Sequence, residues 1–175
     1  MDKKFLFLCV AAILIFGACN SDGTSGGGAV TTGGGNMDCS TYATTGQVES
    51  AFGLSSTTGQ TVTSTSTYCE YGWSTGGSNI ILNVWNDGSQ SMAEAQTQTV
   101  CPSSGYTLES SNVGIGDGIY SCTQGYISSG NCLIGILSFS VGAMAVQISV
   151  PGSSSNCAAA LSDAETLGRE IAANL

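Results

Sequence analysis

The middle of the chain alternates apolar and polar residues, which is the pattern of strands with one buried face. Two such stretches, residues 67–73 and 79–86, flank Gly76-Gly77, and a two-residue Gly-Gly loop is typical of a β-hairpin. Closing the loop pairs three apolar residues of each strand: Cys69 with Val84, Tyr71 with Leu82, and Trp73 with Ile80. The other face then presents four aromatic or polar side chains: Tyr68, Glu70, Asn83 and Trp85.

Further strands are predicted at residues 118–123, 132–139 and 143–150, with the last two joined around Val141-Gly142. The Ser/Thr-rich segment 57–67 is interpreted as a solvated strand edge. The motif Thr44-x-x-Gln47 resembles a capping box and predicts a short helix that Gly53 ends. The motif Ser91-x-x-Glu94 repeats this signature and predicts a second helix up to Val100, before Cys101-Pro102.

The clearest helix is C-terminal, where one stripe of apolar and small residues recurs at helical spacing: Cys157, Ala160, Leu161, Ala164, Leu167, Gly168, Ile171 and Leu175. On its outer side, Glu165 and Arg169 are spaced to form an i, i+4 ion pair. We therefore predict an α+β fold for residues 38–175: an antiparallel sheet of about five strands, with an N-terminal helix and the long C-terminal helix packed on one face.

The first residues have a different pattern. Lys3 and Lys4 precede an unbroken apolar run of 12 residues, which is too short to span a bilayer as a helix, and Gly17-Ala18 precede Cys19. This resembles a bacterial lipoprotein signal peptide over residues 1–18, with Cys19 as the lipidated first residue of the mature chain. The alternative is an ordinary cleaved secretion signal. Residues 19–37, rich in Gly, Ser and Thr, are predicted to form a flexible tether.

The signal-peptide interpretation implies a lipid-anchored protein of the cell membrane or outer membrane, on the extracytoplasmic side. Removing residues 1–18 leaves Arg169 as the one basic side chain against eleven carboxylates. Nucleic-acid binding is excluded because it requires a basic patch to displace phosphate counterions. The same negative charge argues against a polybasic contact with anionic headgroups, so membrane contact is expected through the lipid alone.

Six cysteines remain in the domain after Cys9 and Cys19 are set aside, and an even count in an exported chain favours three disulfides. Six cysteines allow 15 pairings, of which we favour Cys39–Cys69, Cys101–Cys157 and Cys122–Cys132. The chain has no histidine and no Cys-x-x-Cys motif. It therefore lacks the residues that a zinc-ribbon site or a thioredoxin-like redox site requires. We expect neither a metal nor a cofactor.

The domain contains, in this order, Asp38-Cys39, a helix, Cys69-x-x-x-Trp73, the segment 113–118 and the C-terminal segment 167–175. In this order of motifs it resembles the small bacterial lipoproteins of unknown function described mostly in actinobacteria. The resemblance implies a bridge between the first two cysteines, which agrees with Cys39–Cys69, whereas four further cysteines depart from the family. It implies no catalytic residues.

Several apparent active-site motifs lack the residues that their chemistry needs. The segment 72–76 matches the G-x-S-x-G nucleophile elbow, but no His exists to activate Ser74, so a hairpin turn is favoured. The segment 114–118 lacks the spacing of a dinucleotide loop and the Lys of a P-loop, which favours a turn. A calcium loop over 83–94 would place Trp85 at a ligand position. Carboxylate-only hydrolysis needs two close acids, and the candidates are Glu70, Asp87, Glu94 and Asp117.

We therefore predict a non-enzyme with a binding or accessory role in the cell envelope. Its contact surface would be the hairpin face of Tyr68, Glu70, Asn83 and Trp85, because aromatics beside polar groups suit a protein, peptide or glycan partner. A loop or the Cys39 segment could instead cover Trp85 and make it part of the core. The alternatives are a structural or protective surface lipoprotein and a carboxylate-dependent hydrolase.

Overall fold

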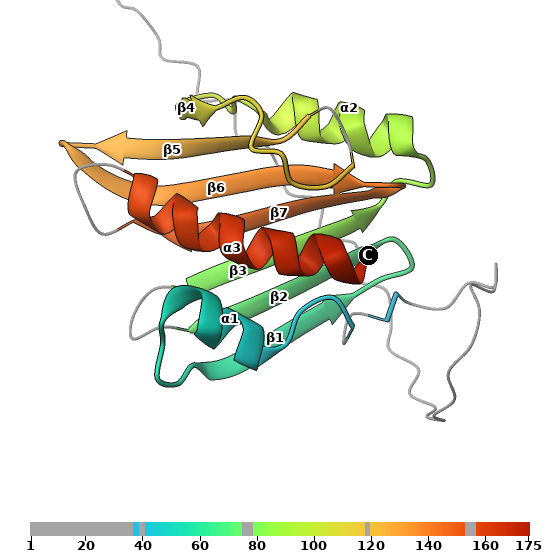
Figure 1. Ribbon diagram of the computed structural model, residues 1–175, viewed down its shortest axis with the longest axis horizontal. Helices are drawn as coiled ribbons and strands as arrows, with labels where there is room; N and C mark the ends of the chain where they lie inside the picture. Colours follow the sequence, from blue (N-terminus) through green and yellow to red (C-terminus); the bar gives the residue numbers. More distant parts are fainter. Residues whose placement is uncertain (1–36, 39–40, 75–78, 118–119, 153–156) are drawn as a thin grey trace, which may run out of the picture. The chain divides into compact units, whose positions relative to one another are not determined.

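One antiparallel sheet organises the domain, in the strand order β1-β2-β3-β7-β6-β5-β4 (Figure 1). The computed structural model describes residues 37–38, 41–74, 79–117, 120–152 and 157–175, all within the unit Gly34–Leu175. The seven strands are β1 Thr58–Ser64, β2 Tyr68–Ser74, β3 Asn79–Asn86, β4 Thr107–Ser110, β5 Cys122–Ser128, β6 Asn131–Val141 and β7 Met144–Pro151. The three helices in these ranges are α1 Thr45–Phe52, α2 Gln90–Val100 and α3 Ala158–Asn174.

The sheet consists of two meanders that meet at its centre. Strands β1 to β3 form one, β4 to β7 form the other, and β3 pairs with β7 between them. The chain passes from β3 to the far edge at β4 through α2, so α2 has to cross one face of the sheet. The expected α+β class with an antiparallel sheet is confirmed, but five strands was too few.

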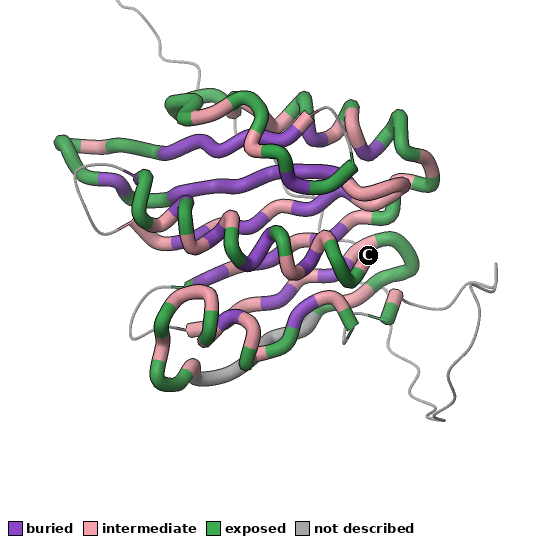
Figure 2. The backbone as a smooth tube through the Cα atoms, in the orientation of Figure 1, coloured by how far each residue is buried: buried purple, intermediate pink, exposed green. Residues whose placement is uncertain are grey.

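The first hairpin has the predicted register. Cys69 pairs with Val84, Tyr71 with Leu82, and Trp73 with Ile80. All six side chains are buried in the main core, together with their neighbours on β7 and β6, of which Ile148 and Leu137 pair directly. Figure 2 shows the buried positions running along the central strands. Burying a side chain of this size stabilises the fold by about 1.5–3 kcal/mol, so this face is the main source of stability.

Helices α1 and α3 cover that apolar face, as predicted (Figure 1). The capping box of Thr44 and Gln47 is present at the start of α1, and Gly53 ends the helix with φ of 61°. The predicted stripe of α3 is buried at five positions: Leu161, Ala164, Leu167, Gly168 and Ile171. Gly168 lets the helix approach β6 closely, because a Cβ there would lie 2.7 Å from Leu137 Cδ2.

Helix α2, for which the sequence pattern predicted no face, packs on the face opposite α1 and α3. Side chains alternate along β6: Leu137 and Phe139 face α3, whereas Ser138 and Ser140 point the other way and are nevertheless buried. Helix α2 contacts β6 and β7 and supplies the cover for this second face. Its N-cap is Ser89, whose hydroxyl accepts from the Met92 amide at 3.4 Å, and not the predicted Ser91.

Two strands differ from the predictions. The expected strand at 118–123 is β5, which begins four residues later at Cys122. The short edge strand β4 was not predicted, and the predicted edge segment 57–67 contains β1. A Cβ on Gly125 of β5 would overlap the Cys157 sulfur, so a glycine is required in mid-strand and the apolar alternation is lost there.

Two predicted disulfides are wrong. Cys101 bonds to Cys122 and Cys132 bonds to Cys157. Cys122 pairs with Ser138 in the β5–β6 ladder, six residues from Cys132, so the predicted Cys122–Cys132 bond would join distant ends of a hairpin. The predicted Cys101–Cys157 bond would join helices on opposite faces of the sheet. Cys69 is disulfide-bonded, and its predicted partner Cys39 lies outside the described residues.

Candidate functional site

The four residues of the predicted binding face come together on β2 and β3. Tyr68 pairs with Trp85 and Glu70 pairs with Asn83 across the hairpin. All four point away from the core face, since they alternate with the buried residues Cys69, Tyr71, Leu82 and Val84. We call these four residues the hairpin cluster.

The Tyr68 hydroxyl is the centre of the hairpin cluster. Its oxygen lies 2.7 Å from Glu70 Oε2 and 2.6 Å from Asn83 Oδ1. The hydroxyl has one proton, which it can donate to either oxygen, and both acceptors lie within hydrogen-bond distance of it. The rings of Tyr68 and Trp85 lie 5.5 Å apart at an angle of 33°, which is within the range of favourable aromatic pairs. The cluster is therefore ordered by its own contacts.

These contacts change the acidity of the phenol. The pKa of Tyr68 is raised well above its ordinary value of 10.0, first by burial and then by the hydrogen bond to Glu70 and the negative charge of that carboxylate. The phenol is thus neutral at physiological pH and stays a hydrogen-bond donor. The raised pKa therefore keeps the phenol able to donate to Glu70 or Asn83.

The hairpin cluster is neither covered nor fully exposed. All four side chains are of intermediate burial, including Trp85, which is therefore not a fully buried core residue. Trp85 pairs with Ala145 on β7, which is buried, so one side of the indole adjoins a covered part of the sheet. The Cys39 segment, which we considered as a cover for Trp85, includes residues outside those that the structure describes.

A shallow hollow of about 260 Å³ continues this surface toward the other end of the strands. It is lined by Asn79 and Ile81 of β3, Ser149 and Pro151 of β7, and Leu133 and Ile134 of β6. Ile81 precedes Asn83 by one repeat of the pleat, two residues, so the hollow adjoins the hairpin cluster. Leu133 and Ile134 are 47% and 38% exposed, which makes this end of the surface apolar.

Sequence reasoning missed the hollow because of an irregularity in β6. Tyr126 pairs with Ile134 but Ile127 pairs with Cys132, so Leu133 is an extra residue in the ladder. Such a bulge interrupts the alternation that normally sends one of two consecutive apolar residues into the core. The one available hint in the sequence was the adjacent pair Leu133-Ile134 at the start of a predicted strand.

The other motifs have structural roles. Ser74 ends β2 and pairs with Asn79, so the elbow-like segment lies at a strand–strand connection whose residues 75–78 are outside the described residues. Gly114 and Gly116 have positive φ in a turn, and the Asp117 carboxylate accepts from the Gly142 amide at 2.9 Å. The region 83–94, considered for calcium, is divided between β3, a turn and α2.

The four acids that could support hydrolysis have separate partners. Glu70 accepts from Tyr68, Glu94 accepts from Gln90 at 2.9 Å, and Asp117 accepts from Gly142. Asp87 faces the side-chain amide of Gln96 at 2.9 Å and 3.0 Å, and partial burial raises its pKa. No group of three or more His, Cys, Asp or Glu side chains suited to a metal occurs among the described residues.

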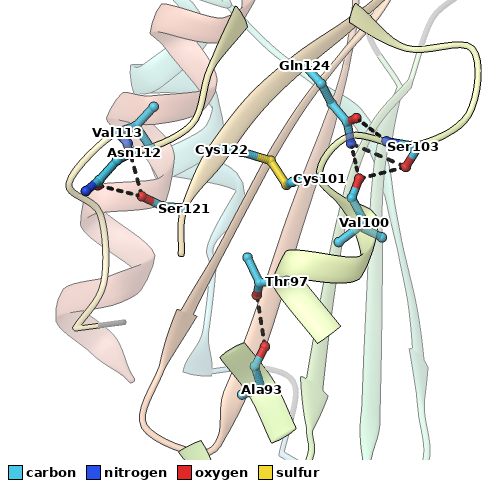
Figure 3. Close-up of a disulfide and its surroundings, with 10 residues drawn as sticks. All are labelled: Ala93, Thr97, Val100, Cys101, Ser103, Asn112, Val113, Ser121, Cys122 and Gln124. Atoms are coloured by element: carbon cyan, nitrogen blue, oxygen red, sulfur yellow. Dashed lines mark hydrogen bonds between the residues drawn. A yellow bond between two sulfur atoms is a disulfide. The ribbon is translucent and has the colours of Figure 1, made fainter. Parts of the chain in front are cut away.

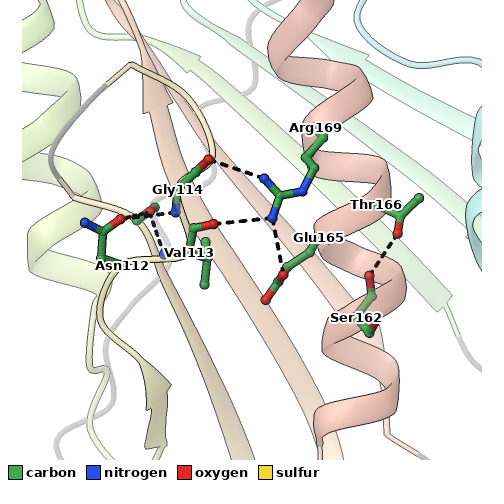
Figure 4. Close-up of polar contacts among 8 residues, drawn as sticks. Asn112, Val113, Gly114, Ser162, Glu165, Thr166 and Arg169 are labelled. Carbon is green, nitrogen blue, oxygen red and sulfur yellow. Dashed lines mark hydrogen bonds and ion pairs between the residues drawn. The ribbon is translucent and has the colours of Figure 1, made fainter.

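Arg169 fixes a loop rather than presenting a free charge. Its guanidinium donates to the carbonyl oxygens of Gly114 at 3.3 Å and Val113 at 3.4 Å, and it pairs with Glu165 at 3.7 Å (Figure 4). The predicted i, i+4 ion pair is thereby confirmed. The arginine links α3 to the turn before β5, so its role in the described contacts is to position that turn.

No family model, no curated protein and no solved structure matches the chain. Among the described residues, no helix has both the length and the apolar character needed to cross a membrane.

Proposed function

We propose that this protein is a lipid-anchored, extracytoplasmic binding domain, without catalytic activity, that contacts a protein of the cell envelope through the hairpin cluster and the adjoining hollow. The observation that carries the proposal is the geometry of the cluster: the Tyr68 hydroxyl lies within hydrogen-bond distance of Glu70 and Asn83, and its ring is tilted against Trp85. The cluster lies on the sheet face opposite α1 and α3, the face that α2 covers over β6 and β7. Residues 1–18 would direct the chain to lipidation at Cys19.

A protein partner suits this surface better than a small charged ligand. The surface combines a polar, ordered end with an apolar end at Leu133 and Ile134. Interface hot spots are enriched in Trp and Tyr within surroundings that exclude water, and Tyr68 and Trp85 supply such anchors. The exposed aliphatic side chains of Leu133 and Ile134 are matched best by apolar side chains of a protein partner.

The test is crosslinking in the native envelope followed by mass spectrometry. The wild-type chain is compared with a Glu70→Ala/Trp85→Ala variant at equal abundance, after circular dichroism has shown that both fold. The matched control is Ile127→Ala/Glu170→Ala, which also removes one acid and one large apolar side chain but lies outside the hairpin cluster and the hollow.

The proposal expects one defined partner to crosslink to wild type and control and to be lost from the Glu70→Ala/Trp85→Ala variant. Truncating a hot-spot aromatic typically costs 2 kcal/mol or more, about a thirtyfold loss of affinity. An unchanged partner list in all three chains contradicts the proposed surface. It would favour a structural or protective role, for which the disulfides that tie helix ends to the sheet are the relevant feature.

A further inference from the structure

A larger cleft, of about 370 Å³, lies on the other side of α2 from the hairpin cluster. One wall is the C-terminal half of α2, with Thr97 and Gln98, and the other is formed by β4 and the segment leading into β5, with Leu108, Asn112 and Tyr120. The Cys101–Cys122 disulfide connects the two walls (Figure 3). This volume falls in the range of about 300–1,000 Å³ that is usual for small-molecule sites.

The α2 wall is held in place by buried polar contacts. Gln124, fully buried in β5, donates to the Val100 carbonyl at 2.7 Å and accepts from the Ser103 amide at 2.7 Å (Figure 3). These bonds fix the chain where it leaves α2, next to Cys101. The end of the helix therefore cannot move away from the sheet without breaking two hydrogen bonds and straining the disulfide.

The second wall is fixed in a similar way. The Ser121 hydroxyl accepts from the Val113 amide at 3.0 Å and donates to Asn112 Oδ1 at 3.3 Å, and Asn112 Oδ1 also accepts from the Gly114 amide at 3.1 Å. Figure 3 shows Asn112 and Ser121 on one side of the disulfide, with Thr97 of α2 below it. A cleft with both walls held before binding loses little conformational entropy when a ligand enters.

The chemistry of the lining is neutral. Hydroxyl and amide groups come from Thr97, Gln98, Ser111, Asn112 and Ser121, and none of the described residues that line the cleft is charged. Amide and hydroxyl groups can both donate and accept, which is the requirement for recognising a polyol. Tyr120 and the 41% exposed Leu108 add apolar area to the same walls.

Charged ligands are disfavoured here. The described part of the lining offers no carboxylate to pair with a cation and no basic group to pair with an anion. The formal net charge of −9 also repels anions at long range. A ligand that combines many hydroxyl groups with an apolar C–H face, and has no charge, matches both the polar and the aromatic part of the lining.

We infer that this cleft binds a sugar ring of a neutral saccharide. The site goes beyond the proposed function, since it shares no residue with the hairpin cluster or the adjoining hollow and depends on neither. The saccharide would occupy the space between Gln98 and Asn112, with Tyr120 and Leu108 as the apolar contacts.

The experiment is saturation-transfer difference NMR on the full chain in detergent, with maltotriose and tri-N-acetylchitotriose as neutral probes and glucuronic acid as the anionic probe. Gln98→Trp fills the cleft from an exposed position of α2. Thr99→Trp is the matched control, because Thr99 is also exposed but does not line the cleft. Tyr120→Leu keeps apolar volume and removes the aromatic ring.

We expect at least one neutral trisaccharide to bind, Gln98→Trp to weaken it by about tenfold or more, and Thr99→Trp to change the affinity by less than about twofold. Tyr120→Leu should also weaken binding, and glucuronic acid should give no signal that Gln98→Trp removes. The inference is overturned if neither trisaccharide binds, if Gln98→Trp binds like wild type, or if glucuronic acid binds as tightly as the neutral probes. Circular dichroism of each variant excludes unfolding as the cause.

Discussion

Tyr68 is the residue whose chemistry is most altered by its surroundings. Its hydroxyl contacts the Glu70 carboxylate and the Asn83 amide oxygen, and its pKa is raised first by burial and then by the hydrogen bond to Glu70 and the charge of Glu70. The phenol of Tyr71, buried in the core on the other face of the same strand, also has a raised pKa, of about 12, chiefly because of burial. Two phenols of one strand are thus protected from ionisation for partly different reasons.

Replacing Tyr68 by Phe should remove one late-ionising phenol from the alkaline titration, measured by ultraviolet difference absorbance. Glu70→Gln should lower the pKa of Tyr68, because the carboxylate charge that raises it is gone, whereas burial remains. At neutral pH, Tyr68→Phe should cost about 1 kcal/mol of unfolding free energy, the usual value of a hydrogen bond. An unchanged number of late-ionising phenols in Tyr68→Phe would contradict the assigned contacts.

The raised pKa of Tyr68 also makes the unfolding free energy of the domain depend on pH. Above a pH of about 10, the unfolded chain ionises Tyr68 while the native state keeps the proton, so the native state binds more protons. The stabilisation is complete below that pH and decreases as the pH rises toward the raised pKa of Tyr68. The stability of Tyr68→Phe should fall less steeply over this range.

Two glycines of the turn before β5 allow backbone strain and steric overlap to be tested separately. Gly114 and Gly116 have φ of 65° and 79°, so a side chain at either position would be strained. A Cβ at Gly114 would meet nothing within 4 Å, whereas one at Gly116 would overlap the Ser140 carbonyl oxygen of β6. The two positions therefore share the backbone strain and differ in the steric overlap.

Gly114→Ala should cost about 1–2 kcal/mol, which is the strain of a left-handed backbone. Gly116→Ala should cost about 1–3 kcal/mol more, because the turn has to move away from β6. Urea unfolding of both variants measures the difference. Equal losses would mean that the turn does not pack against Ser140 as described.

Helices and hairpins formed by residues close together in the sequence could be predicted from local sequence patterns. The β2–β3 register followed from the Gly76-Gly77 loop and the alternation around Trp73, and α1 followed from the capping box at Thr44. The hairpin cluster was predictable for the same reason, since its four residues come from one hairpin. The hollow was not, because it combines β3, β7 and the bulged β6, and strands distant in the sequence bring these residues together.

The disulfides show why the remaining features could not be read from the sequence. Their pairing depends on which face α2 crosses, and nothing in the pattern of residues 90–100 specifies a face. Once α2 lies over β6 and β7, its end at Cys101 is beside Cys122. The beginning of α3, at Cys157, is then beside Cys132 on the other face.

Digestion without reduction should therefore release one peptide pair that joins Cys101 to Cys122 and one that joins Cys132 to Cys157. A Cys101→Ala/Cys122→Ala variant should lose about 3 kcal/mol of unfolding free energy, because a sequence separation of 21 residues is no longer closed in the unfolded chain. Cys132→Ala/Cys157→Ala, with a separation of 25, should lose a similar amount. A peptide joining Cys101 to Cys157 would contradict the topology.

Both proposed binding surfaces depend on how the domain is attached to the membrane. Its formal net charge of −9 gives it no electrostatic attraction to anionic lipid, and its one domain arginine is engaged with Val113, Gly114 and Glu165. A stable membrane contact would therefore have to come from covalent lipid, at about 0.8 kcal/mol for each buried methylene group. The Gly-rich tether would let the domain reach about 20–25 Å from the lipid, far enough for either proposed surface to meet a partner.

If the chain is anchored by lipid on Cys19, replacing Cys19 and replacing Cys9 should have different effects on lipidation. In a bacterial host labelled with palmitate, wild-type chain should incorporate label and have the mass of a lipidated chain that begins at Cys19. Cys19→Ala should carry no label, because no thiol would remain at the proposed lipidation position. Cys9→Ala should be labelled like wild type, since Cys9 belongs to the segment that the proposed processing would remove. Label on Cys19→Ala, or an unmodified mature chain that begins at another residue, would replace the lipoprotein interpretation with an ordinary secretion signal.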